Sequence, residues 1–213
     1  MRSVLVVLGF TVAVTTAAPG QAQPQPAADA QLSIGGSVGL SPIGALKSQV
    51  SGGPAFSDDA ATAFQVNGLL DYRVTPLLSI GFAPGIIFNV KTSNGDSSGT
   101  ELDLPLRLAL GEPVAPKIRV YGFVSPGYSV LFPPSNSGSG HPSGLMVGFG
   151  GGVGLRVAPG IMLTGELGYQ FRFLSTTETI NLGTIGGGID VTSHVSLQEN
   201  YLTLAVGVVA ALP

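Results

Sequence analysis

The sequence predicts an all-β protein, specifically an eight-stranded antiparallel up-and-down transmembrane β-barrel. Eight segments alternate between apolar and small or polar residues, and the connections between them are alternately long and short. Only 10% of the residues are charged, against ~25% in a typical soluble domain. Beyond the N-terminus no stretch approaches the ~20 apolar residues of a spanning helix. The nine Lys and Arg residues form no basic stripe, which argues against a nucleic-acid partner.

The first 22 residues are predicted to be a secretory signal peptide. Arg2 precedes an apolar run from Val4 to Val14, and small residues lead to Gly20-Gln21-Ala22. A membrane-anchor helix is the alternative, but it would need a longer run. Residues 23–30 are predicted to be a flexible mature N-terminus, and residues 31–210 the barrel domain. The chain has no cysteine, so it forms neither disulfides nor thiolate metal sites, and a lipid-anchored N-terminus is not expected.

Each of the eight segments carries large apolar side chains at every second position and small or polar ones between them. In chain order the segments, with their apolar faces, are Gln31–Leu40 (Leu32, Ile34, Val38, Leu40), Thr62–Tyr72 (Phe64, Val66, Leu70, Tyr72), Leu77–Val90 (Leu78, Ile80, Phe82, Ile86, Phe88), Thr100–Leu110 (Leu102, Leu104, Leu106, Leu108, Leu110), Lys117–Phe132 (Ile118, Val120, Val124, Tyr128, Val130), Gly144–Val157 (Leu145, Val147, Phe149, Val153, Leu155), Ile161–Phe173 (Leu163, Leu167, Tyr169, Phe171, Phe173) and Gln198–Ala210 (Leu202, Leu204, Val206, Val208).

The connections also favour a membrane barrel. They are predicted as Ser41–Ala61, Arg73–Pro76, Lys91–Gly99, Gly111–Pro116, Pro133–Ser143, Ala158–Gly160 and Leu174–Leu197. In a meander, alternate connections lie at opposite ends, so four long loops share one end and three tight turns the other. Outer-membrane barrels combine short periplasmic turns with longer extracellular loops. An even strand number also returns both termini to the periplasmic side.

The two faces are predicted to be inverted relative to a soluble barrel, with Leu, Ile, Val and Phe outward toward lipid and small or polar residues inward. Buried charges must be paired, so the inward charged residues are interpreted as an ion-pair network that fills the lumen. The predicted network comprises Asp71, Glu101, Asp103, Arg107, Arg119, Arg156, Glu166, Arg172 and Glu199. A selective channel or a catalytic carboxylate pair is the alternative interpretation.

Aromatic residues support this orientation. Six of them lie on the proposed lipid face near the ends with long loops, where an interfacial girdle is expected. The predicted girdle comprises Phe64, Phe88, Tyr128, Phe132, Phe171 and Phe173. The girdle at the other end is thin, with Tyr72 as its main candidate, and the chain has no Trp.

Residues 31–210 resemble the small OmpA/OmpX-like "porin family" barrels of the Gram-negative outer membrane. The resemblance is carried by the segments Glu101–Leu108, Val120–Gly127, Val147–Gly154 and Tyr201–Val208. It implies a location in the bacterial outer membrane, with membrane lipid, lipopolysaccharide and the assembly machinery as partners. Members commonly end in an aromatic residue that this machinery reads, whereas this chain ends Ala211-Leu212-Pro213.

No catalytic, cofactor or metal site is predicted. His194 lies near Ser193, Ser196 and Glu199, which allows a lipid-modifying esterase as a minor alternative, but a triad requires geometry rather than spacing. Two separate His residues, His141 and His194, do not make a metal site. Asp58-Asp59 is interpreted as a solvated surface pair.

Function is therefore expected in the loops, as a structural or surface-interaction role that could include an extracellular ligand. Ser41–Ala61 and Leu174–Leu197 are the longest of these predicted loops. Besides the esterase, two alternatives remain. A narrow pore for small solutes would need a water path past Arg107, Arg119 and Glu166. A soluble lipocalin-like ligand binder would need the Leu102–Leu110 stripe to face inward.

Overall fold

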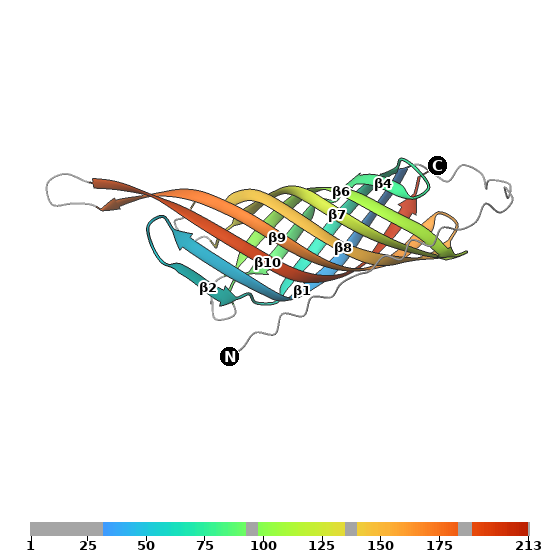
Figure 1. Cartoon of the computed structure of the whole chain (residues 1–213), viewed down its shortest axis with the longest axis horizontal. Helices are drawn as coiled ribbons and strands as arrows, with labels where there is room; N and C mark the ends of the chain where they lie inside the picture. The colour runs from blue at the N-terminus through green and yellow to red at the C-terminus, as the bar shows by residue number, and fades with distance from the viewer. Residues whose placement is uncertain (1–31, 93–97, 135–139, 183–188, 213) are drawn as a thin grey trace.

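The computed structural model describes residues 32–92, 98–134, 140–182 and 189–212, which form one antiparallel β-sheet (Figure 1). The strands are β1 (Leu32–Val50), β2 (Ala55–Asp59), β3 (Ala63–Arg73), β4 (Leu78–Phe82), β5 (Gly85–Val90), β6 (Gly99–Ala115), β7 (Ile118–Phe132), β8 (Ser143–Ala158), β9 (Ile161–Leu182) and β10 (Ile189–Ala211). No helix in the described segments is long and apolar enough to cross a membrane. The predicted signal peptide and the flexible segment 23–30 lie outside the described residues.

The sheet closes into a barrel because β1 pairs with both the last strand and β3. Residues Leu32–Ser41 of β1 pair with β3, and Ser33–Leu40 also pair with β10. From β10 the wall continues through β9, β8, β7 and β6 to β4 and β5, and then to β3. All of these pairings are antiparallel, and apart from the closing β1–β10 pair the wall follows the order of the chain, which confirms the predicted up-and-down topology.

The ten strands make eight positions in the barrel wall, as predicted. β4 and β5 share one position, because each pairs with β3 on one side and β6 on the other. They separate at Ala83-Pro84, where proline has no N–H to donate to a neighbouring strand. β2 and β3 share another position, because both pair with β1, at successive levels.

Tight turns and both described chain ends lie at one end of the barrel. β3 and β4 are joined by residues 74–77, β6 and β7 by Pro116-Lys117, and β8 and β9 by Pro159-Gly160. At the same end the Leu212 N–H donates to the Leu32 carbonyl at 2.8 Å. We call this the short-turn end. The opposite, long-loop end carries the connections β1–β2, β5–β6, β7–β8 and β9–β10.

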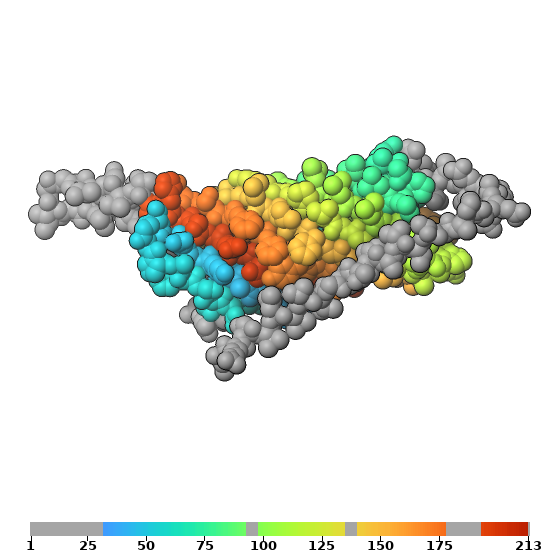
Figure 2. All heavy atoms as spheres, in the orientation of Figure 1, coloured from blue at the N-terminus to red at the C-terminus, as the bar shows by residue number. Residues whose placement is uncertain are grey.

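Two of the predicted long loops are largely strand. The predicted loop Ser41–Ala61 contains the second half of β1 and all of β2, joined by a turn at residues 51–54. The predicted loop Leu174–Leu197 is a β-hairpin whose pairing runs from Leu174↔Leu197 to Leu182↔Ile189. Figure 1 shows this β9–β10 hairpin reaching well past the rest of the wall. Figure 2 shows β1 and β2, in blue and cyan, beside the red residues of β10 at the same end of the barrel.

The apolar faces point outward, as predicted. In β6, Leu104, Leu106, Leu108 and Leu110 are 39–64% exposed, whereas Glu101 and its alternate neighbours point into the barrel. Leucines this exposed in a row are suited to lipid rather than water. The soluble lipocalin-like alternative is therefore wrong, because it needed this stripe to face inward.

A small apolar cluster lies inside the barrel near the long-loop end. We call it the inner collar, and it comprises Leu46, Ala60, Ala63, Ile87, Val90, Leu131, Leu174 and Tyr201, with Leu197 packed against it. Apart from Ala60, which lies between β2 and β3, these side chains come from β1, β3, β5, β7, β9 and β10. The lumen thus has polar residues along its length and an apolar layer near one end.

Candidate functional site

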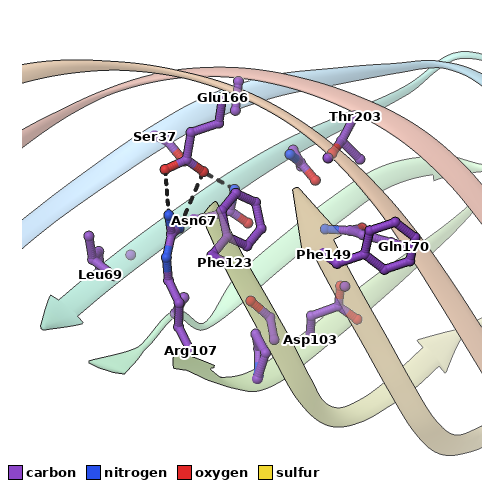
Figure 3. A pocket seen from close by; sticks show the side chains of 18 of the residues that line it. Ser37, Asn67, Leu69, Asp103, Arg107, Phe123, Phe149, Glu166, Gln170 and Thr203 are labelled. Atoms are coloured by element: carbon purple, nitrogen blue, oxygen red, sulfur yellow. Dashed lines mark hydrogen bonds and ion pairs between the residues drawn. The ribbon is translucent and has the colours of Figure 1, made fainter. Parts of the chain in front are cut away.

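The middle of the lumen is crossed by an ion pair between Arg107 of β6 and Glu166 of β9, with β7 and β8 between them in the wall. The contact is bidentate, with Arg107 Nη1 donating to Glu166 Oε2 at 3.2 Å and Nη2 to Oε1 at 2.7 Å. The Tyr121 hydroxyl donates to the same Oε1 at 2.7 Å. Figure 3 shows the guanidinium directed at Glu166 with Phe123 beside it, 4.2 Å from the guanidinium carbon to the ring centroid. A bidentate, charge-assisted contact fixes both side chains across the lumen.

Glycines of β8 make room for these aromatic rings. A Cβ on Gly152 would lie 2.6 Å from Cζ of Tyr121, and one on Gly150 would lie 2.9 Å from Cζ of Phe123. The glycine face predicted for this strand therefore lines the lumen and lets the rings approach its backbone.

Around the ion pair lies a cavity of about 70 Å³, which has room for only a few water molecules. Its lining includes Asn67, whose amide Nδ2 donates to the Ser37 hydroxyl at 3.1 Å, together with Gln170 and Thr203 (Figure 3). Polar side chains from opposite walls thus meet inside the barrel.

A second charged cluster lies between this cavity and the inner collar. Arg172 is fully buried, and its Nε lies 3.1 Å from Glu101 Oε1. Its Nη2 lies 2.8 Å from Asp103 Oδ2 and donates to Gln170 Oε1 at 2.6 Å. The Ser129 hydroxyl contacts both Glu101 and Asp103. One guanidinium thus binds two carboxylates from β6 across the barrel.

Glu199 is the third buried carboxylate of this cluster, but it takes no part in the contacts of Arg172 described above. It lies directly opposite Arg172 in the β9–β10 register and is fully buried. Its carboxyl group lies beside that of Glu101, and neither of its oxygens accepts a hydrogen bond from Arg172 or Ser129. The three buried carboxylates Glu101, Asp103 and Glu199 therefore face a single described guanidinium.

Above Glu199, at the long-loop end, lies a larger pocket of about 430 Å³, which we call the mouth pocket. It is lined by Leu46, Ser48, Phe56, Ser57, Asp58, Val90, Lys91, Thr92, Leu131, Leu197 and Glu199. Sequence reasoning missed it, because Leu46, Phe56 and Leu197 lie in segments predicted to be loops. Moreover, a register shift between Leu40 and Ile43 reverses the alternation in β1, so that even-numbered residues point outward before it and Leu46 points inward after it.

The nine residues of the predicted interior network occupy several places. The structure groups Glu101, Asp103, Arg172 and Glu199 in one cluster and Arg107 with Glu166 in another. Asp71 and Arg119 are half-buried. Arg156 is exposed near the short-turn end and joins neither cluster, because its strand ends two residues later.

The six residues of the predicted girdle lie on the outer face. Phe64, Phe88, Tyr128, Phe132 and Phe173 are exposed, and Phe171 is half-buried. Phe171 packs against Tyr169 and Phe149, with ring centroids 4.8 and 6.1 Å away. These three rings form an aromatic cluster on the outer surface of β8 and β9.

The residues weighed for an esterase do not form a triad. His194 and Glu199 are five positions apart on a regular strand and so point to opposite faces of β10. His194 Nδ1 lies 3.0 Å from the Thr177 hydroxyl, and the Ser196 hydroxyl donates to the Gln49 carbonyl at 3.3 Å. Asp58 and Asp59 are exposed on β2, and the described residues contain no His, Asp or Glu cluster that could hold a metal ion.

Comparisons with known proteins agree with this architecture. The family model of the outer membrane protein beta-barrel domain matches residues 8–192. No curated protein matches the sequence. Among solved structures, Neisserial surface protein A (NspA) is similar, with a TM-score of 0.51 and 12% identity, covering 85% of this chain and 97% of that one. The outer membrane protein OprG from Pseudomonas aeruginosa is also similar, with a TM-score of 0.50 and 14% identity, covering 84% and 96%.

These two similarities show the fold, and the family match covers most of the chain. Together with the outward apolar face and the closed wall, they establish where the protein resides. The chain belongs to the outer membrane protein β-barrel domain family and is an integral protein of the bacterial outer membrane.

Proposed function

We propose that the protein is a non-conducting outer-membrane barrel that acts through its long-loop end on the outer surface of the cell. The observation that carries this proposal is the filling of the lumen. The Arg107–Glu166 pair crosses the middle, and the Arg172 cluster and the inner collar lie above it. Eight-stranded barrels have interiors just wide enough for side chains to fill.

The long-loop end offers the surface for such a role. The β1–β2 and β9–β10 hairpins extend past the rest of the wall, on a rigid scaffold of the kind that positions binding segments. On β2 the side chain of Phe56 is 65% exposed. An apolar ring held out on a paired strand is suited to contact with another molecule.

We assign the chain no catalytic step. The opposite orientations of His194 and Glu199 on β10 argue against the esterase alternative. The partners implied by the membrane setting are outer-membrane lipid, lipopolysaccharide and the assembly machinery, and an extracellular ligand would bind at the long-loop end.

Planar-bilayer recording tests the closed lumen. The purified protein should insert, as shown by a gel-mobility shift between unheated and boiled samples, yet give no discrete conductance steps. A general diffusion porin reconstituted in the same way serves as the positive control. Conductance steps whose ion selectivity changes in an Arg107→Gln variant would overturn the proposal and establish the narrow pore instead.

A further inference from the structure

We propose that the mouth pocket binds a small organic cation, consisting of an ammonium group on an apolar body, and that Glu199 receives the ammonium. This inference goes beyond the proposed function and rests on it only in placing the long-loop end outside the cell. It is independent of whether the barrel conducts.

The charge of the cluster beneath the pocket points to a cation. Arg172 directs its described hydrogen bonds and ion pairs to Glu101, Asp103 and Gln170. Glu199 is fully buried beside Glu101 and accepts no hydrogen bond from Arg172, so three carboxylates share one described guanidinium. An excess of carboxylates over guanidinium groups in a low-dielectric interior is costly, so a cation that reaches Glu199 binds favourably.

The pocket has the size and lining of a small-molecule site. Its volume of about 430 Å³ lies within the usual ~300–1,000 Å³ range of ligand pockets. Its walls are mainly apolar, with Leu46, Phe56 and Leu131 among them, and Glu199 is the least exposed of its lining residues. Apolar walls with a few polar groups that fix orientation are typical of such sites.

The other charged lining residues do not favour an anion. Asp58 and Lys91 carry opposite charges that offset each other. The net charge of the pocket lining is therefore that of Glu199, which is negative. A metal ion fits less well than an organic cation, because no described cluster has the arrangement to hold one. The Arg172 guanidinium also occupies the space between Glu101 and Asp103. The apolar walls instead match a hydrocarbon body.

The test uses the full-length mature protein in phosphatidylcholine vesicles, with protein-free vesicles as the blank. Calorimetric titration compares 1-naphthylmethylamine with the uncharged 1-naphthylmethanol, which has a similar size and shape. We expect the amine to bind at least about tenfold more tightly than the alcohol, since hydrogen bonds to charged groups are the stronger ones.

Two matched variants then distinguish a direct contact with Glu199 from the effect of the protein's overall charge. Glu199→Gln should weaken amine binding about tenfold or more and leave alcohol binding unchanged. Glu112→Gln removes the same charge from an exposed position near the short-turn end and should leave both unchanged. Each variant is first shown to be folded by the gel-mobility shift on boiling.

Four results would overturn the inference. These are no amine binding to the wild type, equal binding of amine and alcohol, full amine binding by folded Glu199→Gln, or full amine binding by Ser48→Trp. The last variant keeps Glu199 and places a large ring at a residue that lines the pocket. It should abolish amine binding, so it decides the question even if Glu199→Gln does not fold.

Discussion

Arg172 lies among three buried carboxylates and forms ion pairs with two of them, Glu101 and Asp103. Its Nε and Nη2 atoms lie 3.1 Å from Glu101 and 2.8 Å from Asp103, and its guanidinium carbon lies 5.3 Å from the centroid of the Tyr201 ring. Its side chain, like that of Glu101, is fully buried. Removing one partner from a buried ion pair leaves an uncompensated charge, which costs far more than a lost surface contact.

Arg172→Met is therefore expected to lower the free energy of unfolding by about 3–5 kcal/mol. Urea titration of the protein in phosphatidylcholine vesicles, followed by the gel-mobility shift, measures this change. Arg156→Met makes the same chemical change at an exposed residue and should stay within about 0.5 kcal/mol of the wild type. Equal effects of the two substitutions would contradict the assigned role of the Arg172 cluster.

At the scale of the strands, alternation predicts the elements well wherever one face meets lipid and the other the lumen. The Leu102–Leu110 stripe and the glycine face of β8 both lie on the predicted sides. The prediction fails in the second half of β1, in β2 and in β9–β10 beyond Leu174, because these segments are rich in Gly, Ser and Thr and have no regular apolar period. Backbone pairing still extends there, as from Leu174↔Leu197 to Leu182↔Ile189.

A substitution at Gly152 tests whether the close packing of rings against the glycine face of β8 stabilises the protein. In Gly152→Val the new Cβ would lie 2.6 Å from Tyr121 Cζ, so the ring must move and its bond to Glu166 is lost. Overpacking of this kind costs about 1–3 kcal/mol, measured by the same urea titration. Gly165→Val, at a position with nothing within 4 Å of the new Cβ, is the matched control and should cost little. A Gly152→Val protein as stable as Gly165→Val would show that this close packing is unimportant.

For the whole molecule, the sequence predicts the strand number, the topology and the outward apolar face, but not which interior charges meet. Arg107 and Glu166 are 59 residues apart and come together only because strand tilt and register bring β6 opposite β9. The mouth pocket depends on a register shift in β1 and on strands that extend past the predicted barrel. Local alternation carries no information about either feature.

The central claim is that this barrel presents its long-loop end to the outside of the cell. The chain has no cysteine, so single-cysteine variants report one position each. Ser51→Cys lies in the β1–β2 turn at the long-loop end, and Lys117→Cys lies in the β6–β7 turn at the short-turn end. Both are exposed, which makes them matched probes.

The most direct measurement is labelling of these two variants with a membrane-impermeant maleimide on intact Gram-negative cells that express them. We expect Ser51→Cys to be labelled on intact cells, and Lys117→Cys only after the outer membrane is permeabilised. Labelling of Lys117→Cys on intact cells, with Ser51→Cys protected or labelled to the same extent, would contradict the account.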